Sequence, residues 1–462
     1  MNILLLNSME DFNFISPSNK KLESPRFPPL GLLYIASSLI DEGNKVKIID
    51  LIVEKNPIPE ILKNLKDVDL VGISTNSFTN KVSASVAKLI KETDPSIKVV
   101  IGGPHCTFFP RQSLVDIPYA DISVEGDGER TVKYLVNALN GYGKLSDIPG
   151  VYYRIKNKIN AGKPAEIISN LDKISFPARF LVEKNEYGKV GNSFFFRPKI
   201  TSMATTRGCP FRCRFCSRND YFKNFRQRSA ENVVKEIIEI NDKYKTVIIT
   251  DENFLTDTKR ADKIFDKLIQ QGTKIDLAIE GTRVDTAEKG LYKKMKRAGV
   301  KFIAFGIESG NQDVLDYYNK KITLDQIRKA VKLANKMNFT CVGNFIFGAP
   351  IETQKHIEQT IKFARSLPLD IAFFYPLSYM WGSDMWHEAI KNGKISETEG
   401  YFVHADSTRE LGNFTFEQLK TFCKKAEKEF FYNPHYIFRR LIKTIKTLNL
   451  LNQTLLIEIQ LN

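Results

Sequence analysis

The stretch "KITSMATTRGCPFRCRFCSR", residues 199–218, sets a short apolar run before a basic, glycine-led loop with three cysteines, Cys209, Cys213 and Cys216. A structural zinc site usually takes four protein ligands, arranged as two short pairs. This loop supplies three, and no His or Cys follows at a matching distance. An iron–sulfur cube held by three thiolates leaves one iron open to a small molecule. The absence of a fourth cysteine is therefore read as the functional feature.

The loop follows the first of six strand–helix units in the second half of the chain. The expected strands are residues 199–206, 246–252, 275–282, 301–309, 341–348 and 370–377. A helical pattern follows each strand except the last. Six such units in one series predict a partial (β/α)6 TIM-type barrel over residues 196–395, with its active residues on loops at the carboxyl ends of the strands.

The first part of the chain also alternates strands with helices. The expected strands are residues 2–7, 45–51, 70–75, 98–103 and 120–126, with amphipathic segments at 30–43 and 82–94. This predicts an α/β domain over residues 1–145, built on a doubly wound parallel sheet. Ligands of such sheets lie outside the carboxyl ends of the strands. Residues 146–195 break the rhythm and are predicted to be a linker. Residues 396–462 predict a helical carboxy-terminal region, broken near Asn433 and Pro434.

Length and composition set outer bounds. A chain of 462 residues suits two or three domains. Its start, "MNILLLNSMEDF", has no basic leader, and no apolar run approaches the roughly 20 residues of a membrane span. We therefore expect a cytoplasmic protein. The formal net charge of +15 suits nucleic acid, anionic lipid or acidic metabolites, but lysines spread along the chain are also what a lysine-biased genome produces. The isolated Cys106, Cys341 and Cys423 are expected to be buried packing residues.

The cysteine spacing, on the loop after the first barrel strand, resembles the signature of the radical S-adenosylmethionine (radical SAM) superfamily. The resemblance implies that Cys209, Cys213 and Cys216 hold a [4Fe-4S] cluster whose open iron is chelated by SAM. It also implies that one electron, from a donor such as flavodoxin or ferredoxin, cleaves SAM to methionine and a 5′-deoxyadenosyl radical. That radical removes a hydrogen atom from an unactivated carbon. The alternative is a structural or zinc-binding loop with three reduced cysteines.

Other strand ends resemble the places where this superfamily contacts SAM. The residues predicted to contact SAM are Phe215, Asp251, Asn253, Arg283, Glu308, Gly348 and Pro350. In "TDENF" (250–254) the usual Gly-Gly-Glu is replaced by Asp251, Glu252 and Asn253. Arg283 offers a planar fork suited to a carboxylate. For each motif alone an ordinary turn or a solvated ion pair explains the residues as well, but their order at barrel spacing supports a shared site.

Three stretches ahead of the barrel resemble the Rossmann-like cobalamin-binding domain of the cobalamin-dependent radical SAM class: "PRFPPLGLLYIASSL" (25–39), "GGPHCTFFP" (102–110) and "VEGDGERT" (124–131). The residues predicted to contact cobalamin are Ser74, Thr75, Gly102, Gly103, Pro104, His105, Glu125 and Gly126. The two glycines permit unusual φ angles and close approach, and Pro104 stiffens the turn. For Ser74 and Thr75, with Asn76 and Ser77, ordinary turn chemistry is the alternative.

The Asp-x-His-x-x-Gly pattern that supplies a histidine to cobalt in other cobalamin carriers is absent. We therefore expect cobalt to lack a lower histidine ligand. His105 is expected either near the nucleotide tail of the cofactor or in a purely loop-stabilising role.

The class implies methylation of an unactivated carbon, with the methyl group taken from methylcobalamin and a second SAM restoring it. Ring formation, rearrangement or oxidation is the alternative outcome, and no catalytic acid or base is assigned. An RNA-modifying methylthiotransferase is disfavoured, and with it a nucleic-acid partner, because residues 1–100 contain no cysteine and the tail reads as helical. A cobalamin carrier that has lost its chemistry is disfavoured by the intact cysteine loop.

The substrate is predicted to be a small molecule or lipid-like. Residues 431–446, "FYNPHYIFRRLIKTIK", resemble the tail of relatives that act on isoprenoid lipids or tetrapyrroles. The apolar side of this expected helix carries Phe438, Leu441, Ile442 and Ile445, and its cations are Arg439, Arg440, Lys443 and Lys446. Such a helix is able to lie on an anionic membrane surface. The alternative is a helix packed on the barrel with a solvated basic face.

Overall fold

The computed structural model describes residues 1–9, 26–190, 193–194, 196–217, 223–396, 399–443 and 445, with only the backbone of 190, 193 and 194. The strands are β1 (Asn2–Asn7), β2 (Lys45–Asp50), β3 (Leu70–Ser74), β4 (Lys98–Gly102), β5 (Ile122–Val124), β6 (Val151–Ile155), β7 (Lys158–Ala161), β8 (Lys189–Val190), β9 (Ser193–Phe194), β10 (Ile200–Met203), β11 (Thr206–Arg207), β12 (Arg226–Gln227), β13 (Thr246–Ile249), β14 (Asp276–Thr282), β15 (Val300–Glu308), β16 (Thr340–Phe347), β17 (Ile371–Pro376), β18 (Ser378–Met380) and β19 (Phe402–His404).

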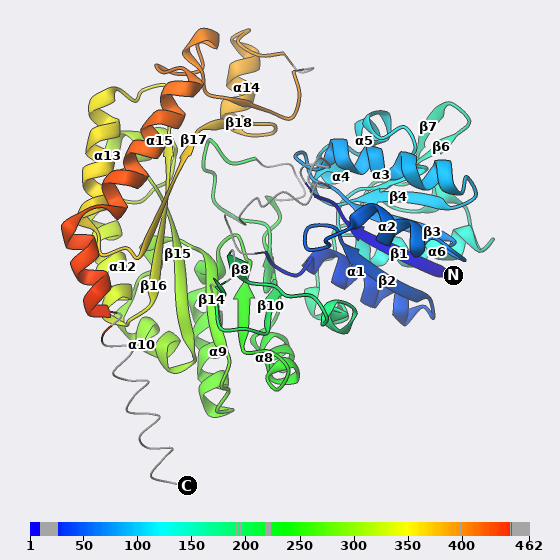
Figure 1. The fold of residues 1–462 in the computed structure, drawn as a ribbon, viewed down its shortest axis with the longest axis horizontal. Coiled ribbons are helices and arrows are strands. Elements are labelled where there is room, and N and C mark those ends of the chain that lie inside the picture. Colours follow the sequence, from blue (N-terminus) through cyan, green and yellow to red (C-terminus); the bar gives the residue numbers. More distant parts are fainter. Residues whose placement is uncertain are drawn as a thin grey trace. The chain divides into compact units, whose positions relative to one another are not determined.

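The helices are α1 (Leu30–Asp41), α2 (Pro57–Lys63), α3 (Asn80–Thr93), α4 (Pro104–Phe108), α5 (Pro110–Asp116), α6 (Gly128–Leu139), α8 (Ala230–Ile240), α9 (Thr258–Gln270), α10 (Lys289–Arg297), α11 (Gln312–Tyr317), α12 (Leu324–Lys336), α13 (Gln354–Ser366), α14 (Asp384–Lys391) and α15 (Phe416–Phe431) (Figure 1). A further helical stretch covers residues 434–443.

The chain divides into two compact units. Unit 1 comprises residues 1–208, 219–250 and 273–276, and unit 2 comprises residues 209–218, 251–272 and 277–462. The predicted domain boundaries at residues 145 and 195 both lie inside unit 1, and they stay predictions.

The first sheet of unit 1 has the strand order β2-β1-β3-β4-β5-β6-β7. Strands β1 to β5 are parallel, and β6 and β7 extend the edge in antiparallel fashion. Successive side chains of β1 point to opposite faces. Leu5 joins the core that contains residues of α1 and α6, whereas Leu4 joins the core that contains residues of α3 and α5. The sheet is therefore covered by helices on both faces, which confirms the predicted doubly wound class.

Residues 146–195, predicted to be a linker, do more than connect. They supply β6 and β7 to the sheet, and they are tied to α1 by two hydrogen bonds. The Ser37 hydroxyl donates to the Phe176 carbonyl oxygen at 2.5 Å, and the Ala178 amide donates to the Leu33 carbonyl oxygen at 3.0 Å. The sequence pattern did not reveal these two strands, because an antiparallel pair at the edge interrupts the alternation of strands and helices although the sheet continues.

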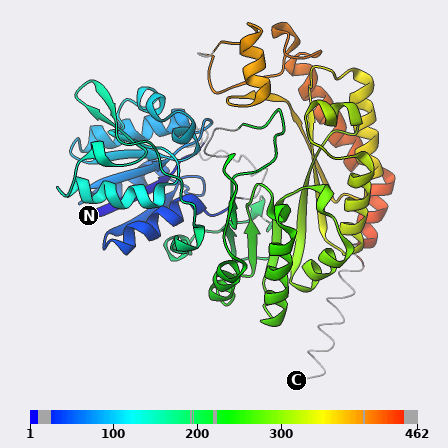
Figure 2. The same ribbon diagram turned by 180° about the vertical axis from the view of Figure 1, so that it is seen from behind.

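The second sheet has its six strands in chain order, β10-β13-β14-β15-β16-β17. The pairs of β10 with β13 and of β14 to β17 in succession are parallel. This confirms the partial (β/α)6 barrel. Helices α12, α13 and α15 lie along one side of β15 to β17 in both ribbon views (Figures 1 and 2). Helix α12 begins with a capping box between Thr323 and Gln326, and it buries Ile327, Ala330, Val331 and Ala334.

The helical carboxy-terminal region is confirmed. Its last described helix exposes the apolar side that a membrane-surface helix needs, whereas its cations bond to residues 369 and 370, which contradicts the predicted solvated basic face. The buried carboxylate of Asp370 accepts from Arg440 at 2.7 Å and from Lys443 at 2.8 Å, and Arg439 donates to the Leu369 carbonyl oxygen. Its exposed apolar side chains are Ile437, Phe438, Leu441, Ile442 and Ile445. Periodicity identifies which side chains share a face, but a buried carboxylate decides which face turns inward. Lys446 and the apolar end lie outside the described residues.

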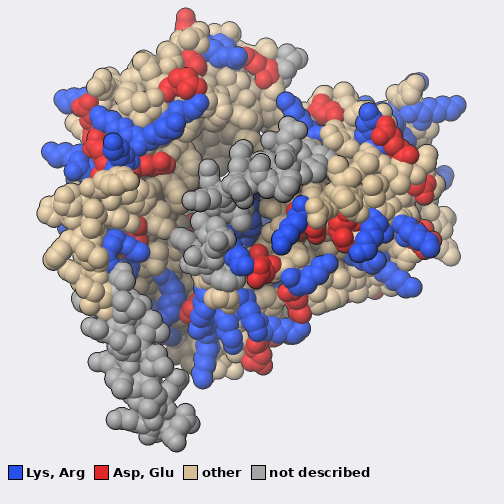
Figure 3. Space-filling model, in the orientation of Figure 1, with Lys and Arg blue, Asp and Glu red and all other residues tan. Residues whose placement is uncertain are grey.

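Charge and hydropathy add two findings. On the face shown in Figure 3, Lys and Arg side chains are spread among acidic ones over both units, which agrees with a lysine-rich composition better than with a nucleic-acid surface. None of the helices in the described part of the chain has the length and apolarity needed to cross a bilayer. Cys106, Cys341 and Cys423 are buried, as predicted.

Candidate functional site

The cysteine loop begins unit 2 and presents its three thiols to different degrees. Cys213 is buried, Cys209 is half-buried and Cys216 is exposed, and the Cys216 amide donates to the Cys213 carbonyl oxygen at 3.1 Å. Burial raises the pKa of the Cys209 thiol, although Lys320 acts in the opposite direction. Among the described residues no group of three or more His, Cys, Asp or Glu side chains is placed to hold a metal ion. Three thiols on one loop remain a donor set suited to a cluster with an open corner, and the assignment stays a prediction from spacing.

A turn after α11, residues 317–321, backs the cysteine loop. The Arg214 amide donates to the Tyr318 carbonyl oxygen at 2.9 Å, and the Asn319 side-chain amide donates to the Arg212 carbonyl oxygen at 2.7 Å. The Arg214 guanidinium lies 4.3 Å from the centre of the Tyr317 ring. Asn319 and Lys321 have positive φ angles of 51° and 52°, so the backbone is bent sharply where these contacts form. Sequence reasoning missed this support because it lies about 100 residues from the loop.

Phe215, predicted to contact SAM, packs edge-on against Tyr318, with ring centres 5.1 Å apart. Two residues later, Ser217 donates its hydroxyl to the Trp381 carbonyl oxygen at 2.6 Å. The aromatic-rich stretch after β17 therefore also holds the loop, and Trp386 in that stretch is fully buried.

Glu308, at the end of β15, forms a buried ion pair with Lys320, whose ammonium lies 2.5 Å from its carboxylate. Glu308 has a φ of 67°, which is rare for a residue with a side chain. A Cβ on Gly306 would lie 2.6 Å from that carboxylate, so only glycine fits beneath the pair. Burial lowers the pKa of Lys320, but the charges of Glu308 and Cys213 together raise it above its ordinary value. A fixed positive charge therefore lies behind the cysteine loop.

Arg283 already has a carboxylate on its guanidinium. It donates to Asp285 at 2.8 Å and to the Lys320 carbonyl oxygen at 2.9 Å, and its guanidinium carbon lies 3.9 Å from the centre of the Phe211 ring. In this structure Arg283 braces the cysteine loop through Phe211. Its predicted contact with the SAM carboxylate stays a prediction.

The end of β16 is held by a carboxylate that the sequence reading did not single out. Glu352 is fully buried and accepts from the amides of Gly348 and Ala349 at 2.6 and 2.9 Å. Burial raises the pKa of Glu352 to about 7, although the two amides act in the opposite direction. The spacing "GAPIE", with an acid four residues after the glycine, was the available signal. Gly348 has a φ of 115°, a conformation that favours glycine, so the backbone of this turn is able to come close to a ligand, as predicted for SAM.

Some buried polar atoms at this edge have no hydrogen-bond partner. Both side-chain atoms of Asn253 are unbonded although the residue is only 3% exposed, and the Tyr318 hydroxyl and Glu352 Oε1 are also unbonded. A buried side-chain amide without hydrogen bonds is unfavourable unless a ligand supplies them. The backbone of Asp251, two residues before Asn253, packs closely against Gly281, because a Cβ on Gly281 would lie 2.0 Å from the Asp251 carbonyl oxygen. These residues fit the polar groups of a nucleotide-like ligand such as SAM.

In unit 1 the residues predicted to contact cobalamin gather at the carboxyl edge of β3, β4 and β5. Gly103 has a φ of 107°, and a Cβ there would lie 2.7 Å from the Thr75 carbonyl oxygen, so the turn requires glycine. The Thr107 hydroxyl donates to the Gly103 carbonyl oxygen at 3.0 Å and accepts from the Gly126 amide at 3.1 Å. The two predicted cobalamin turns are therefore joined. Burial raises the pKa of Glu125 beside Gly126.

His105 is fully buried. Its Nδ1 lies 3.2 Å from the Ser77 hydroxyl, and its Nε2 lies 3.6 Å from an Asp116 oxygen. Hydrogen bonding from His105, Gln112 and Asn80 outweighs burial and holds the pKa of Asp116 below its usual value. These contacts favour the loop-stabilising role for His105. The expected lack of a histidine ligand to cobalt stays a prediction.

Comparison with known proteins agrees with this division. The family model described as "Radical SAM superfamily" matches residues 203–364, and the one described as "B12 binding domain" matches residues 24–136. The chain is 34% identical to the uncharacterized methyltransferase PH0819 of Pyrococcus horikoshii, over 91% of each chain. It is 27% identical to the cytidylyl-2-hydroxyethylphosphonate methyltransferase of Streptomyces wedmorensis, over 81% of this chain and 80% of that one.

Among solved structures, the cobalamin-dependent S-adenosylmethionine radical enzyme OxsB with aqua-cobalamin and S-adenosylmethionine bound has the same fold, with a TM-score of 0.71. That match has 20% sequence identity and covers 88% of this chain and 65% of OxsB. With a cysteine loop after the first barrel strand and a B12 binding domain ahead of it, the chain belongs to the cobalamin-dependent branch of the radical SAM superfamily.

Proposed function

We propose that this enzyme methylates an unactivated carbon of a small or lipid-like molecule. The observation that carries the proposal is the three-thiol loop, backed by a buried cation and flanked by unbonded polar atoms, in a chain that also carries a B12 binding domain. When bound, the [4Fe-4S] cluster, SAM and cobalamin supply the radical and the methyl group. The chain's own part is to hold these groups and to exclude water. The methyltransferase names of two relatives favour methyl transfer over ring formation or oxidation.

The substrate is proposed to contact the face of β14 to β17 that is turned away from α12, α13 and α15. Phe373 and Tyr375 are 41% and 50% exposed on this face, and they are stacked with ring centres 6.2 Å apart. Strand register places Asn344 beside Phe373 and Ile346 beside Tyr375. A mainly apolar surface with few polar groups suits a substrate with a flat or hydrocarbon part. Burial raises the pKa of Glu280, on β14, to about 7, which suits a group that exchanges protons near neutrality.

Two partners belong to the proposal. The cluster needs a one-electron donor, for which a flavodoxin or ferredoxin is proposed. Membrane contact through the last described helix is proposed to rely on its exposed apolar residues, because Arg440 and Lys443 are held by Asp370. Binding of the enzyme to vesicles should then be nearly independent of salt and of anionic lipid. Binding that vanishes at high salt would contradict this.

The test is anaerobic reconstitution with iron, sulfide and hydroxocobalamin, followed by reduction in the presence of SAM. We expect iron–sulfur absorption and release of 5′-deoxyadenosine. Cys213→Ala should lose both while still binding cobalamin, and Cys423→Ala, which changes a buried cysteine in α15, should lose neither. A colourless, zinc-filled enzyme would contradict the proposal. With SAM carrying a deuterated methyl group, candidate substrates should gain the labelled methyl mass. Turnover without this gain would favour ring formation or oxidation.

A further inference from the structure

The two ends of the cysteine loop are joined by a short ribbon in unit 1. Strand β11 (Thr206–Arg207) precedes the loop and pairs in antiparallel fashion with β12 (Arg226–Gln227), which follows it. Arg207 lies opposite Arg226 in this register. Two arginines side by side repel each other unless acids neutralise them. The carboxylates that neutralise this pair come from the predicted cobalamin stretch "VEGDGERT".

Arg207 binds both acids of that stretch. It donates to Asp127 at 2.5 Å, and it holds Glu129 through both terminal nitrogens, one of them at 3.2 Å. Both carboxylates are nearly buried, at 6% and 7% exposed. Two-point contacts of this kind fix the orientation of both partners as well as their distance. They also raise the pKa of Arg207 beyond its ordinary value despite burial, so it is charged at every physiological pH.

Arg226 completes the group from the other strand. It donates to the second oxygen of Asp127 and, at 2.9 Å, to the Ile168 carbonyl oxygen, and the Ile168 amide donates back to Asp127 at 3.0 Å. Asp127 therefore bridges both strands at the base of the cysteine loop. We name Asp127, Glu129, Arg207 and Arg226 the arginine clamp.

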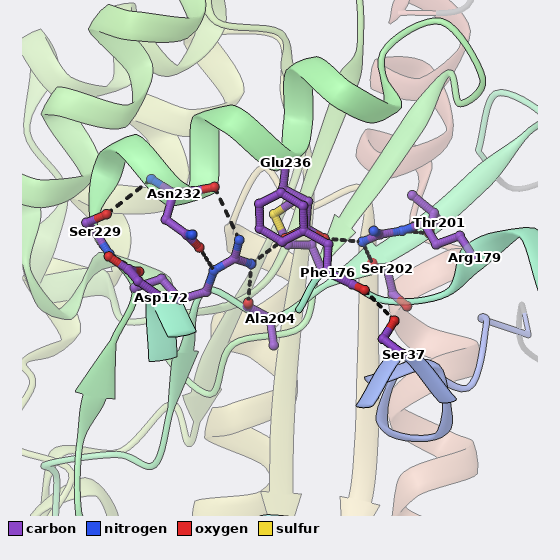
Figure 4. A network of polar contacts seen from close by, with 12 residues as sticks. Ser37, Asp172, Phe176, Arg179, Thr201, Ser202, Ala204, Ser229, Asn232 and Glu236 are labelled. Carbon is purple, nitrogen blue, oxygen red and sulfur yellow. Dashed lines mark hydrogen bonds and ion pairs between the residues drawn. The ribbon is translucent and has the colours of Figure 1, made fainter. Parts of the chain in front are cut away.

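A second buried cluster holds the ribbon from the barrel side of unit 1 (Figure 4). Glu236 of α8 is fully buried and lies 2.5 Å from Arg179 and 2.5 Å from Arg228. Arg228 also donates to the Ala204 carbonyl oxygen at 3.1 Å. This cluster contains no residue predicted to touch a cofactor. It anchors the ribbon structurally, and the arginine clamp connects the ribbon to the cobalamin stretch.

The clamp continues directly into both predicted cofactor sites. Asp127 follows Glu125 and Gly126, the predicted cobalamin contacts, and Gly126 is joined through Thr107 to the Gly103 turn. Arg207 is separated from Cys209 by Gly208 alone. A change in the cobalamin turns therefore has a short covalent and hydrogen-bonded path to the first cluster ligand.

We infer that Asp127, Glu129, Arg207 and Arg226 are positioning residues that make SAM binding at the cluster depend on occupancy of the cobalamin site. The inference rests on the proposed cofactor sites but not on methyl transfer. Coupling of this kind is reciprocal, and commonly amounts to about 5-fold to 150-fold in affinity. Enzyme without cobalamin would then bind SAM weakly and seldom generate an unguided radical.

The test measures SAM affinity of the cluster-loaded enzyme with and without hydroxocobalamin, from the change that SAM causes in the electron paramagnetic resonance spectrum of the reduced cluster. Wild type should bind SAM at least about 5-fold more tightly with cobalamin present. Arg207→Lys keeps the charge but loses the fork. It should still take up cluster and cobalamin, with the ratio of the two affinities close to one.

Arg130→Lys is the matched control, because Arg130 lies next to Glu129 in α6 and, within the described part of the chain, forms its ion pair with the half-exposed Glu166 at 3.2 Å. It should keep the wild-type ratio. If Arg207→Lys does not fold, Glu129→Gln, which leaves the contact to Asp127, should reduce the ratio instead. A wild-type ratio of one, or a clamp variant with the full wild-type ratio, would overturn the inference. Loss of methyl transfer with the ratio intact would count against the proposed function alone.

Discussion

The carboxyl edges of the two parallel sheets differ in how their polar side chains are hydrogen-bonded. At the edge of the first sheet, several polar side chains are bonded to each other or to backbone, although Asn80 Oδ1 and Ser123 Oγ have no hydrogen bond. Asn76 accepts from two amides of its own turn, Thr107 bridges Gly103 and Gly126, and His105 lies between Ser77 and Asp116. We therefore expect a cofactor at this edge to be contacted mainly by backbone and glycine.

At the edge of the second sheet, some buried polar side-chain atoms have no hydrogen-bond partner. Asn253 and Glu352, which follow the ends of β13 and β16, and Tyr318, which follows α11, each have a buried side-chain atom without a hydrogen bond. An unbonded buried group costs stability, whereas a bonded one does not. We therefore predict that cobalamin binding depends mainly on the shape of the first edge, and that SAM binding depends on the unbonded side chains of the second edge.

Lys320→Met should have the largest effect, because it leaves the Glu308 carboxylate buried without a partner. Removing one member of a buried ion pair costs about 3–5 kcal/mol. Thermal unfolding should show a large loss of stability, and the reconstituted cluster should be harder to reduce, because a positive charge behind its ligands is gone. Lys321→Met, at the exposed neighbouring position, should change neither. An unchanged reduction potential in a folded Lys320→Met enzyme would remove this residue from the cluster site.

Gly103→Ala tests the edge that relies on backbone. The positive φ angle costs an alanine about 1–3 kcal/mol, and its Cβ would press on the Thr75 carbonyl oxygen at 2.7 Å. Cobalamin binding, followed by absorbance, should weaken strongly while the cluster still assembles. Gly43→Ala is the control: its φ is 78°, but nothing lies within 4 Å of the added Cβ, so only stability should fall. Equal cobalamin affinity in the two variants would show that the turn does not touch the cofactor.

The features that the sequence predicted are those encoded locally. Strand periodicity assigns Leu4 and Leu5 to opposite faces, and the cysteine spacing marks the loop after the first barrel strand. The chain order of the barrel strands follows from the same rhythm, because parallel strands with short crossovers become neighbours.

The features it did not predict depend on partners far apart in sequence. Asp370 turns the last described helix through Arg440 and Lys443, each about 70 residues away. The clamp joins Asp127 to Arg207 across 80 residues. A single sequence does not show which acidic residue a given arginine will contact. The cations of the last helix were therefore predicted to form a solvated face, whereas in the structure Arg440 and Lys443 pair with the buried Asp370.

Asn253→Leu tests the buried side-chain atoms of the second edge that have no hydrogen bond. Because the amide has no partner to lose, the free energy of unfolding should stay the same or rise, whereas SAM affinity should fall about tenfold or more. Asn311→Leu is the matched control, since its amide donates to the His356 carbonyl oxygen at 2.8 Å and to Thr360 at 2.9 Å. That variant should lose about 1–3 kcal/mol of stability. If Asn253→Leu is the less stable of the two, Asn253 has a structural role and the comparison of edges fails there.

Glu352→Gln should show its effect on stability as a change with pH. Burial raises the pKa of Glu352 from 4.5 to about 7 in the folded chain, so the folded state binds the proton more tightly than the unfolded state. Stability should therefore decline as pH rises from about 4.5 to about 7, and the variant should lose this share of the decline. Denaturant midpoints at intervals from pH 5 to pH 8 measure it. Glu280, whose pKa burial also raises to about 7, contributes the same slope, so Glu280→Gln and the double variant separate the two. A Glu352→Gln profile parallel to wild type would mean that the carboxylate at the end of β16 is already satisfied, and that this edge resembles the first sheet more than the rest of its own.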